Sequence, residues 1–337
     1  MFARSIQLFP GFSFVRLEFE KLTPMIKIIR GLNNIRKKHA GAVVTIGNFD
    51  GVHIGHQMIL RRVNQEAKRL KTRSMLICFE PQPREFFDVY KAPARLTRFR
   101  EKVELLAEQG ISQVLCLKFN EEVRKMSSNR FTSLLVNNLK VRALFVGDDF
   151  KFGNDRRGDF LSLKEAGSKN NFPVHNMYTL DFQAERVSST RIRDSLAIGE
   201  FQLAEKLLGH PFSISGKVIY GRQLGRTIGI PTANIQLHRY VAPISGVFAC
   251  NVFIGQELFF GVANVGVRPT VDDANLTPIL EVHLLNFNRM IYGESVKVVF
   301  LKKLRDEKKY EDLSTLKSAI NQDVRNAERF FESVEVS

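Results

Sequence analysis

The stretch over residues 42–70 constrains the fold of this chain more than any other part of its sequence. It begins with an apolar, β-branched run over 42–46, short enough for one buried strand of a parallel sheet. Two turn signals, Gly47-Asn48 and Asp50-Gly51, then break the run. Apolar residues follow at helical spacing, namely Ile59, Val63, Ala67 and Leu70. A strand, a glycine-rich turn and a helix start predict a phosphate site, because free backbone N–H groups and a positive dipole end meet there.

The alternation of strands and helices continues to about residue 180. Further strands are expected near 73–79, 114–119, 143–146 and 174–178. Helices are expected between them, one with Phe99, Val103 and Leu106 on a single face and one beginning at Asn129. This order predicts an α/β fold with a doubly wound parallel sheet, whose sites lie at the carboxyl ends of the strands.

The pattern of apolar residues changes after Gly209-His210-Pro211. Short apolar or alternating runs follow, separated by Gly, Pro, Asn and Asp turns, over 212–220, 246–254, 258–265, 279–285 and 296–301. They predict a small antiparallel barrel of Greek-key-like type. Apolar residues at helical spacing from Leu313 to Phe331 predict a helix that closes the chain.

The length of 337 residues suggests two domains, each large enough to bury its own core. We set them at 25–209 and 210–337, and we interpret residues 1–24 as a possible extension because residues 25–29 look like a natural beginning. The three cysteines are far apart and form no CxxC pair, which favours a reducing cytoplasm. No apolar run approaches the ~20 residues that a membrane helix needs, so no membrane association is expected.

The formal net charge of +15 calls for a polyanionic partner or a generally basic surface. Nucleic acid is one interpretation. Nucleotide phosphate sites on a solvated basic face are favoured, because the basic residues are dispersed and the densest cluster, 302–309, is interrupted by Asp306 and Glu307. We therefore expect no nucleic-acid partner, and the sequence names no partner protein.

His53 and His56 stand at the turn, where their spacing directs both imidazoles the same way. They could be metal ligands, core histidines or phosphate contacts. The chain has seven histidines and no obvious third ligand nearby, which disfavours zinc. A core position fits poorly with a glycine-rich turn. Hydrogen bonds to transferring phosphate oxygens fit best, because such transfer is mostly positioning and charge stabilisation.

His53-Ile54-Gly55-His56 resembles the HxGH signature of nucleotidylyltransferases, and residues 188–193 resemble the second signature of that superfamily. Together with the contexts over 47–53 and 147–153, they resemble the adenylyltransferase module of the bifunctional riboflavin kinase/FAD synthetases of prokaryotes. The resemblance implies that His53 and His56 are catalytic. It implies ATP binding by Gly47, Asn48, Phe49, Asp50, Gly51, Ser189, Thr190 and Arg193, and FMN binding by Asp149 and Phe150.

Residues 221–234 resemble the riboflavin kinase ATP loop that ends in Pro-Thr-Ala-Asn. On composition alone, an ordinary glycine-rich barrel turn would be the default. Glycines let backbone N–H groups approach phosphates, and Thr232 and Asn234 offer the oxygen ligands that suit Mg²⁺. The resemblance implies ATP binding by Gly221, Gly225, Arg226 and Gly229. Glu281 is a lone carboxylate in an apolar run, and the resemblance makes it the general base for the riboflavin 5′-hydroxyl.

The resemblance implies two ATP-dependent steps, with riboflavin, FMN and ATP as small-molecule partners and Mg²⁺ as cofactor. The barrel would phosphorylate riboflavin to FMN, and the α/β domain would transfer AMP to FMN, giving FAD and pyrophosphate. Two alternatives remain open. The chain could be another HxGH nucleotidylyltransferase with a non-catalytic barrel, or a basic RNA-binding protein whose barrel is an oligonucleotide platform.

Overall fold

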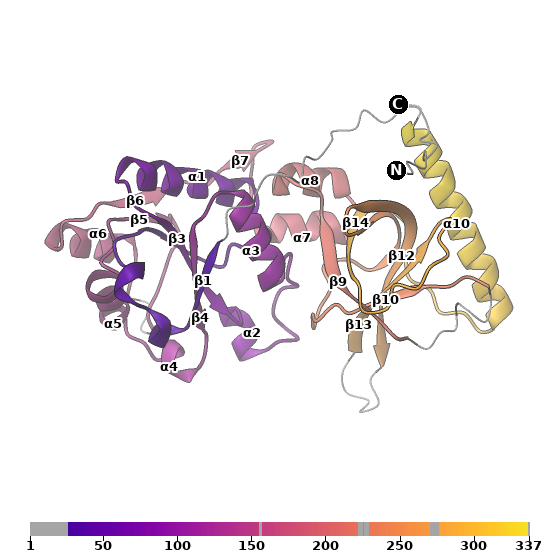
Figure 1. Cartoon of the computed structure of the whole chain (residues 1–337), viewed down its shortest axis with the longest axis horizontal. Coiled ribbons are helices and arrows are strands. Elements are labelled where there is room, and N and C mark those ends of the chain that lie inside the picture. Colours follow the sequence, from indigo (N-terminus) through magenta and orange to yellow (C-terminus); the bar gives the residue numbers. More distant parts are fainter. Residues whose placement is uncertain (1–25, 155–156, 222–224, 226–228, 270–275, 336–337) are drawn as a thin grey trace, which may run out of the picture.

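The computed structural model describes residues 26–154, 157–221, 225, 229–269 and 276–335. It has two bodies, an α/β sandwich and a β-barrel with a long helix beside it, and two short helices lie between them (Figure 1). Arg226 and residues 1–24 belong to the part of the chain outside these ranges.

The first body is built on a parallel sheet with the strand order β1-β4-β3-β2-β5-β6. These strands are β1 (Lys27–Arg30), β2 (Val43–Ile46), β3 (Ser74–Glu80), β4 (Gln113–Lys118), β5 (Ala143–Gly147) and β6 (Val174–Met177). A small hairpin follows, made of β7 (Asp181–Phe182) and β8 (Glu185–Arg186). The predicted strands are confirmed, and β1, which the sequence analysis did not predict, adds an edge strand beside β4.

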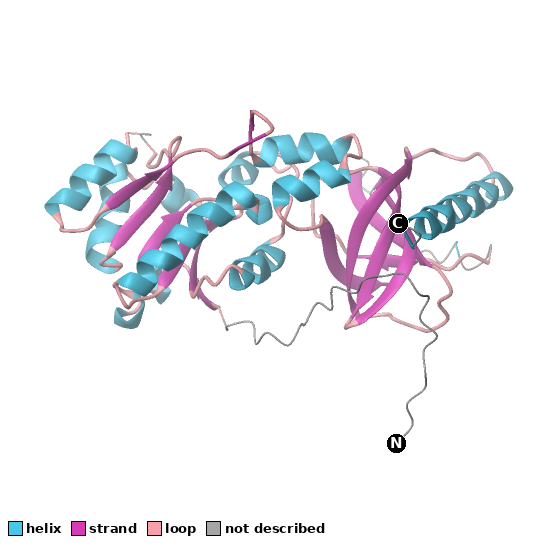
Figure 2. Cartoon of the chain, turned by 90° about the horizontal axis from the view of Figure 1, so that it is seen from above, coloured by secondary structure: helices cyan, strands magenta, loops and turns pink. Residues whose placement is uncertain are grey.

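Helices cover both faces of this sheet (Figure 2), as a doubly wound fold requires. They are α1 (Ile54–Arg69), α2 (Pro83–Phe87), α3 (Phe99–Glu108), α4 (Glu121–Arg124), α5 (Ser128–Ser133), α6 (Phe160–Lys169), α7 (Ser189–Ala197) and α8 (Phe201–Leu208). One apolar core packs α1 and α3 against one face, and another packs α5 and α6 against the opposite face.

The strand order places the predicted phosphate turn at a special point of the sheet. From β2 the chain moves through β3 and β4 in one direction, whereas β5 and β6 lie on the other side of β2. The order therefore reverses at β2, and ligands of open α/β sheets bind at the carboxyl ends of strands beside such a reversal. The turn η3 (Asp50–Val52) and the start of α1 lie at that end.

The second body is a closed antiparallel barrel with the order β10-β13-β12-β11-β14-β9. Its strands are β9 (Ser213–Ile219), β10 (Ala233–Ile235), β11 (Gly246–Ile254), β12 (Glu257–Pro269), β13 (Leu276–Leu284) and β14 (Ser295–Arg305). The helix α10 (Leu313–Glu335) packs Ala327 and Phe331 against the outside of the barrel. The barrel and the closing helix are as predicted, except that β10 was expected to be loop.

The helices α7 and α8 pack into the hydrophobic core of the barrel. Phe201 of α8 packs edge-on against Phe248 of β11 and stacks on Phe300 of β14. The buried apolar residues of α7 and α8 belong to the same cluster as the barrel interior. The end of the first half of the sequence is therefore packed as part of the barrel.

Glu101 of α3 links the two bodies through polar contacts. Its carboxylate accepts hydrogen bonds from the backbone N–H of Ser215 in β9 at 2.8 Å and from the Arg239 guanidinium at 2.7 Å. It also caps α3 by accepting from the Arg98 N–H. The Arg239 side chain is only 1% exposed, and its Nε and Nη1 have no hydrogen-bond partner among the described residues. Glu101 therefore compensates a buried charge across the interface.

We expect Glu101→Gln to destabilise the protein by about 3–5 kcal/mol, because it leaves the Arg239 charge buried without a counter-ion. Urea unfolding measures this loss. Glu104→Gln on the exposed side of the same helix is the matched control and should cost well under 1 kcal/mol. Adding Arg239→Met to Glu101→Gln should restore much of the stability. A Glu101→Gln protein as stable as the Glu104→Gln control would contradict the proposed compensation of the Arg239 charge.

Candidate active sites

The turn after β2 holds its backbone in an uncommon conformation. Phe49, Gly51 and Val52 have positive φ angles of 47°, 82° and 42°. Val52 is β-branched, so it occupies this left-handed region only because its surroundings hold it there. Gly51 has no room for a side chain, since an added Cβ would lie 2.8 Å from a Leu96 carbon. Strain of this kind concentrates at functional sites.

Three aromatic rings stack at the turn. Phe49 stacks on His56 with a centroid distance of 4.5 Å, and His56 stacks on His53 at 3.6 Å. The prediction that the two imidazoles face the same way is thus confirmed. The His56 backbone N–H donates to Nδ1 of His53 at 3.3 Å, which caps α1. Because Nδ1 accepts, the His53 proton resides on Nε2, which can donate to a ligand.

Burial keeps both imidazoles neutral near neutral pH. Desolvation lowers the pKa of His53 to about 4, although the Asp50 carboxylate opposes the change. Burial also lowers the pKa of His56 well below its usual value, and repulsion from protonated His53 and from the Lys102 charge would lower it further. The sequence disfavoured a core position, yet His53 is only 7% exposed, because Phe49 and Val52 fold the turn itself into the core. A neutral imidazole still donates one N–H.

The buried His53 should make the protein less stable in acid. Its pKa is about 4 in the folded protein and about 6.5 in the unfolded chain, so between these values only the unfolded chain binds the proton. The stability is therefore unaffected by this group above about pH 6.5 and decreases as the pH falls toward 4. The loss in the free energy of unfolding reaches about 2 kcal/mol at about pH 5. Urea unfolding at both ends of this range checks the loss. The His53→Gln variant should lose less stability over this pH range than the wild type. Equal losses in the two proteins would contradict the assignment of the effect to His53.

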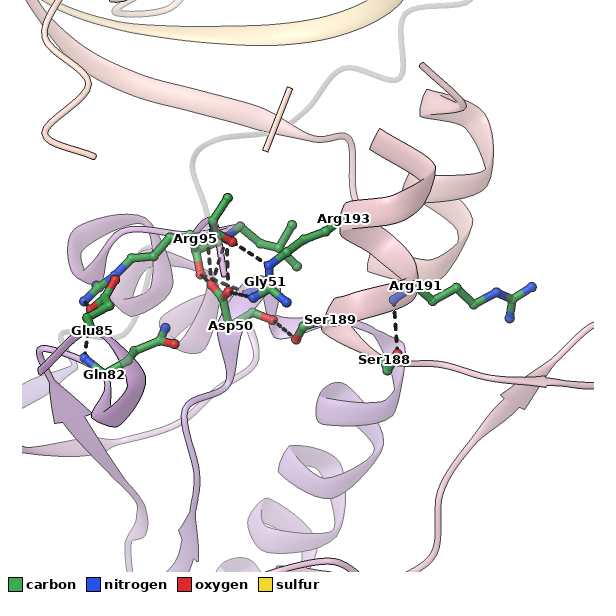
Figure 3. A network of polar contacts seen from close by, with 12 residues as sticks. Asp50, Gly51, Gln82, Glu85, Arg95, Ser188, Ser189, Arg191 and Arg193 are labelled. Atoms are coloured by element: carbon green, nitrogen blue, oxygen red, sulfur yellow. Dashed lines mark hydrogen bonds and ion pairs between the residues drawn. The ribbon is translucent and has the colours of Figure 1, made fainter. Parts of the chain in front are cut away.

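Asp50 ties the turn to two other segments (Figure 3). Its buried carboxylate accepts from the backbone N–H groups of Leu96 and Thr97 at 3.0–3.1 Å and pairs with the Arg193 guanidinium. In return, the Gly51 N–H donates to the Thr97 hydroxyl at 3.0 Å. The carboxylate thus fixes the turn against the segment before α3 and against α7.

The second signature lies directly against the histidine turn. The Ser189 hydroxyl donates to the Asp50 carbonyl at 2.9 Å, across 139 positions of sequence. Ser188 caps α7 by accepting from the Arg191 N–H, while Thr190 is exposed at the first turn of the helix. Figure 3 shows Ser189 and Arg193 reaching from α7 to Asp50. The structure therefore brings the predicted ATP-binding residues together, with Ser189 and Arg193 bound to the turn.

The predicted FMN-binding residues lie on the loop after β5, which neighbours β2 in the sheet. The Asp149 carboxylate is exposed and accepts from the Arg186 guanidinium at 3.0 Å. Phe150 is half-buried and stacks on Phe152 with a centroid distance of 5.6 Å. The loop begins at the same sheet edge as the histidine turn, as predicted, and Arg186 connects it to the strand before the second signature.

A row of three polar residues crosses the barrel. Asn234 of β10 is opposite Glu281 of β13, which is opposite Asn264 of β12. Directly opposed residues share a face of the sheet. Leu280 and Val282 on either side of Glu281 are buried in the barrel interior, so the row lies on the outer face. The half-buried Glu281 therefore lies between two amide-bearing strands.

The glycine loop approaches this row closely. A Cβ added to Gly221 would lie 2.3 Å from the Asn234 side-chain nitrogen. A Cβ added to Gly225 would lie 2.3 Å from the Ile230 carbonyl oxygen and 3.3 Å from the Thr232 hydroxyl. The backbone at Gly221 and Gly225 thus approaches the two predicted metal ligands more closely than a residue with a side chain would allow without a shift. Gly229 is exposed with φ of 81°, and Arg226 lies outside the described residues.

Both halves of the chain match known protein families. The FAD synthetase model matches residues 35–191, and the riboflavin kinase model matches residues 208–331. A curated relative, the bifunctional riboflavin kinase/FMN adenylyltransferase of Escherichia coli K12, is 47% identical over 309 residues, which cover 91% of this chain and 98% of the relative. The chain belongs to the bifunctional riboflavin kinase/FMN adenylyltransferase family.

Other members of this riboflavin kinase/FMN adenylyltransferase family are similarly close. The Pseudomonas fluorescens protein is 48% identical over 303 residues, covering 90% of this chain and 97% of the relative. The Haemophilus influenzae protein is 46% identical over 310 residues, covering 91% of this chain and 100% of the relative. Among solved structures, a Streptococcus pneumoniae protein described as a macrolide-efflux protein shares the fold, with a TM-score of 0.75, 28% identity and coverage of 90% of this chain and 99% of that one. Within the described part of the chain, we find no helix with the length and apolarity to cross a membrane.

Two residues at the sites of this family member, Thr97 and Lys102, were missed by the sequence-based prediction. Thr97 carries no local signal, because its partner in the turn is distant in sequence. Lys102 does carry one. It lies three positions after Phe99 and four before Leu106, so it shares the apolar face of α3 and is fully buried. A charged residue on an apolar stripe could have drawn attention to it.

Proposed function

We propose that this chain converts riboflavin to FMN in its barrel and FMN to FAD in its α/β domain, using one ATP in each step. The proposal rests on one observation. Each half of the chain presents its own cluster of predicted phosphate-binding residues, the histidine turn with α7 in one half and the glycine loop with the row around Glu281 in the other.

In the adenylyl transfer, an oxygen of the FMN phosphate attacks the α-phosphorus of ATP and pyrophosphate leaves. No nucleophile from the protein is required, so the residues serve to position and to stabilise charge. The Nε2–H of His53, and that of His56, would donate to oxygens of the transferring group. The burial of the turn supports this role, because hydrogen bonds are stronger where water is excluded.

The remaining residues of this site would hold the substrates. The turn over 47–51 and the start of α7, with Ser189, Thr190 and Arg193, would bind the triphosphate through hydroxyls, N–H groups and a positive charge. Asp149 and Phe150 would contact FMN. Because Ser189 and Arg193 contact Asp50 in this structure, their binding to ATP would exchange or share those contacts.

In the kinase step, the 5′-hydroxyl oxygen of riboflavin attacks the γ-phosphorus of ATP and ADP leaves. Glu281 would accept the hydroxyl proton, since it is a half-buried carboxylate beside the glycine loop. The backbone at Gly221, Gly225 and Gly229, with the Arg226 side chain, would bind the ATP phosphates.

The barrel residues fit a magnesium ion. Thr232 and Asn234 supply hydroxyl and carbonyl oxygens, which Mg²⁺ prefers, and each lies close to a glycine that has no Cβ to displace it. When bound, the ion would offset the charge of the ATP phosphates and orient them. We propose Mg²⁺ as the companion of ATP at both sites.

The domain division that we propose follows the two sites, with 25–209 as the adenylyltransferase domain, 210–337 as the kinase domain and 1–24 as an extension. A cytoplasmic location is supported by the three free cysteines, all of which are buried. The substrates of the family's reactions, ATP and flavins, also favour that compartment.

Incubating the purified protein with riboflavin, ATP and Mg²⁺, and separating the flavins over time, tests the proposal. FMN should appear first and FAD after it, with ADP and pyrophosphate as the matching products. FAD formation from added FMN with no phosphorylation of riboflavin would favour a nucleotidylyltransferase with a non-catalytic barrel. Salt-sensitive RNA binding without ATP turnover would favour the third hypothesis.

A further inference from the structure

Lys102 is a charged side chain enclosed within the α/β domain. Its exposed fraction is 0%, and its ammonium nitrogen has no hydrogen-bond partner among the described residues. Lysine is almost never fully buried unless it is paired, because the charge loses its hydration. A position that costs folding energy in this way calls for a functional explanation.

The fold directs this side chain toward the histidine turn. The helix α3 follows β3 and leads into the parallel β4, so it begins at the carboxyl edge of the sheet. Helical side chains lean toward the N-terminus of their helix, and Lys102 lies near the start of α3. The helix also packs directly against η3. The lysine therefore reaches toward the edge where His53 and His56 stack.

The charge of Lys102 acts on titratable groups from three elements. Its charge lowers the pKa of His56 on α1, and it acts in the same sense on the thiols of Cys78 on β3 and Cys116 on β4. These two cysteines are opposite each other in adjacent strands. His56 is the one of the three that the proposed mechanism uses.

His56 also has an unused atom on its buried side. Its Nδ1 is buried and has no hydrogen-bond partner among the residues that the structure describes. An ammonium group only donates, and an imidazole nitrogen accepts when the ring proton is on the other nitrogen. Lys102 Nζ and His56 Nδ1 are therefore chemically complementary, and each is buried without a hydrogen-bond partner among the described residues.

We propose that Lys102 is a positioning residue for adenylyl transfer and donates a hydrogen bond to Nδ1 of His56 when nucleotide binds. The bond fixes the His56 proton on Nε2, as the His56 N–H already does for His53. Both rings then present the same donor atom to the transferring phosphate, and a fixed positive charge lies behind them. This inference rests on the proposed adenylyl transfer at the histidine turn.

Lys102→Met tests the proposal because it keeps an unbranched side chain only one atom shorter and removes the donor and the charge. We expect kcat for FAD formation from FMN to fall about 10-fold or more, with little change in KM, because Lys102 does not touch the substrates. Riboflavin phosphorylation should be unchanged. The urea midpoint should be unchanged or higher, since an unpaired buried charge is removed. A purely structural lysine would instead lower the midpoint, and with it both activities.

Two further variants sharpen the result. Lys102→Gln keeps an N–H donor without the charge, so it should recover part of the lost kcat. Lys164→Met on the exposed side of α6 is the matched control and should behave as the wild type. Equal kcat values in Lys102→Met and the control would overturn the proposal.

A second measurement does not depend on activity. In ¹⁵N-histidine NMR spectra recorded with Mg²⁺ and α,β-methylene-ATP, His56 of the wild type should carry its proton on Nε2, and Lys102→Met should show mixed tautomers. The same tautomer in both proteins would overturn the pairing. If the wild type makes no FAD from FMN, the proposed function fails, whereas the spectra still decide whether Lys102 and His56 pair.

Discussion

Glu281→Gln is expected to reduce riboflavin phosphorylation by about 10²- to 10⁴-fold, the usual contribution of a general base. Glutamine has nearly the same shape, so the row across β10, β13 and β12 should keep its packing. What is lost is the negative charge that accepts the riboflavin hydroxyl proton. The measurement is the rate of FMN formation from riboflavin and ATP, with FAD formation from supplied FMN recorded in parallel.

The parallel assay makes the result decisive. FAD formation from supplied FMN should be unchanged in Glu281→Gln, because the adenylyl transfer uses the other site. Glu257→Gln is a matched control on the same barrel, where an exposed carboxylate pairs with Arg289. It should leave both reactions intact. A folded Glu281→Gln protein that still phosphorylates riboflavin at the wild-type rate would remove Glu281 from the proposed role.

His53→Ala should stop the second reaction and spare the first. The loss of one preorganised donor to a transferring group typically costs about 10²–10³ in rate, so FMN should accumulate while FAD formation falls by that factor. Because His53 also caps α1, alanine should lower the stability by about 1 kcal/mol. The flavins formed from riboflavin over time report both reactions in one experiment.

A second substitution separates chemistry from capping. His53→Asn keeps a side chain that can cap the helix but cannot place a donor where Nε2 lies, so it should be stable and still inactive in FAD formation. His175→Ala removes an exposed imidazole that stacks on Phe145 and serves as the control. Loss of both reactions in folded His53→Asn would show that the two sites are not separate.

The sequence predicted those parts of the fold that depend on local pattern. The apolar run over 43–46 and the helical stripe after it define β2 and α1, and they needed no partner to be recognised. β1 (Lys27–Arg30) could not be found this way, because it is short, carries a charge at each end and is defined by pairing with β4. β10 is a three-residue strand fixed by its two neighbours, so its residues read as loop.

The same limit applies to the candidate sites. Motif spacing identified the histidines, the second signature and Glu281, since each motif carries its own chemistry. It did not reveal that Asp50 holds the turn, because the partners of Asp50 at Leu96, Thr97 and Arg193 come from distant segments. Nor did it predict the neutral state of His53, which follows from tertiary burial. Contacts between distant segments, and the desolvation they cause, exist only in the folded chain.

The packing of Phe201 against Phe248 and Phe300 limits where the chain can be cut into fragments or recombined with another chain. A recombination point at residue 209 would separate α8 from the barrel whose interior it completes. Each large apolar side chain uncovered there would cost about 1.5–3 kcal/mol. A kinase fragment that folds on its own must therefore include α8. The folding unit of the barrel thus begins upstream of its first strand.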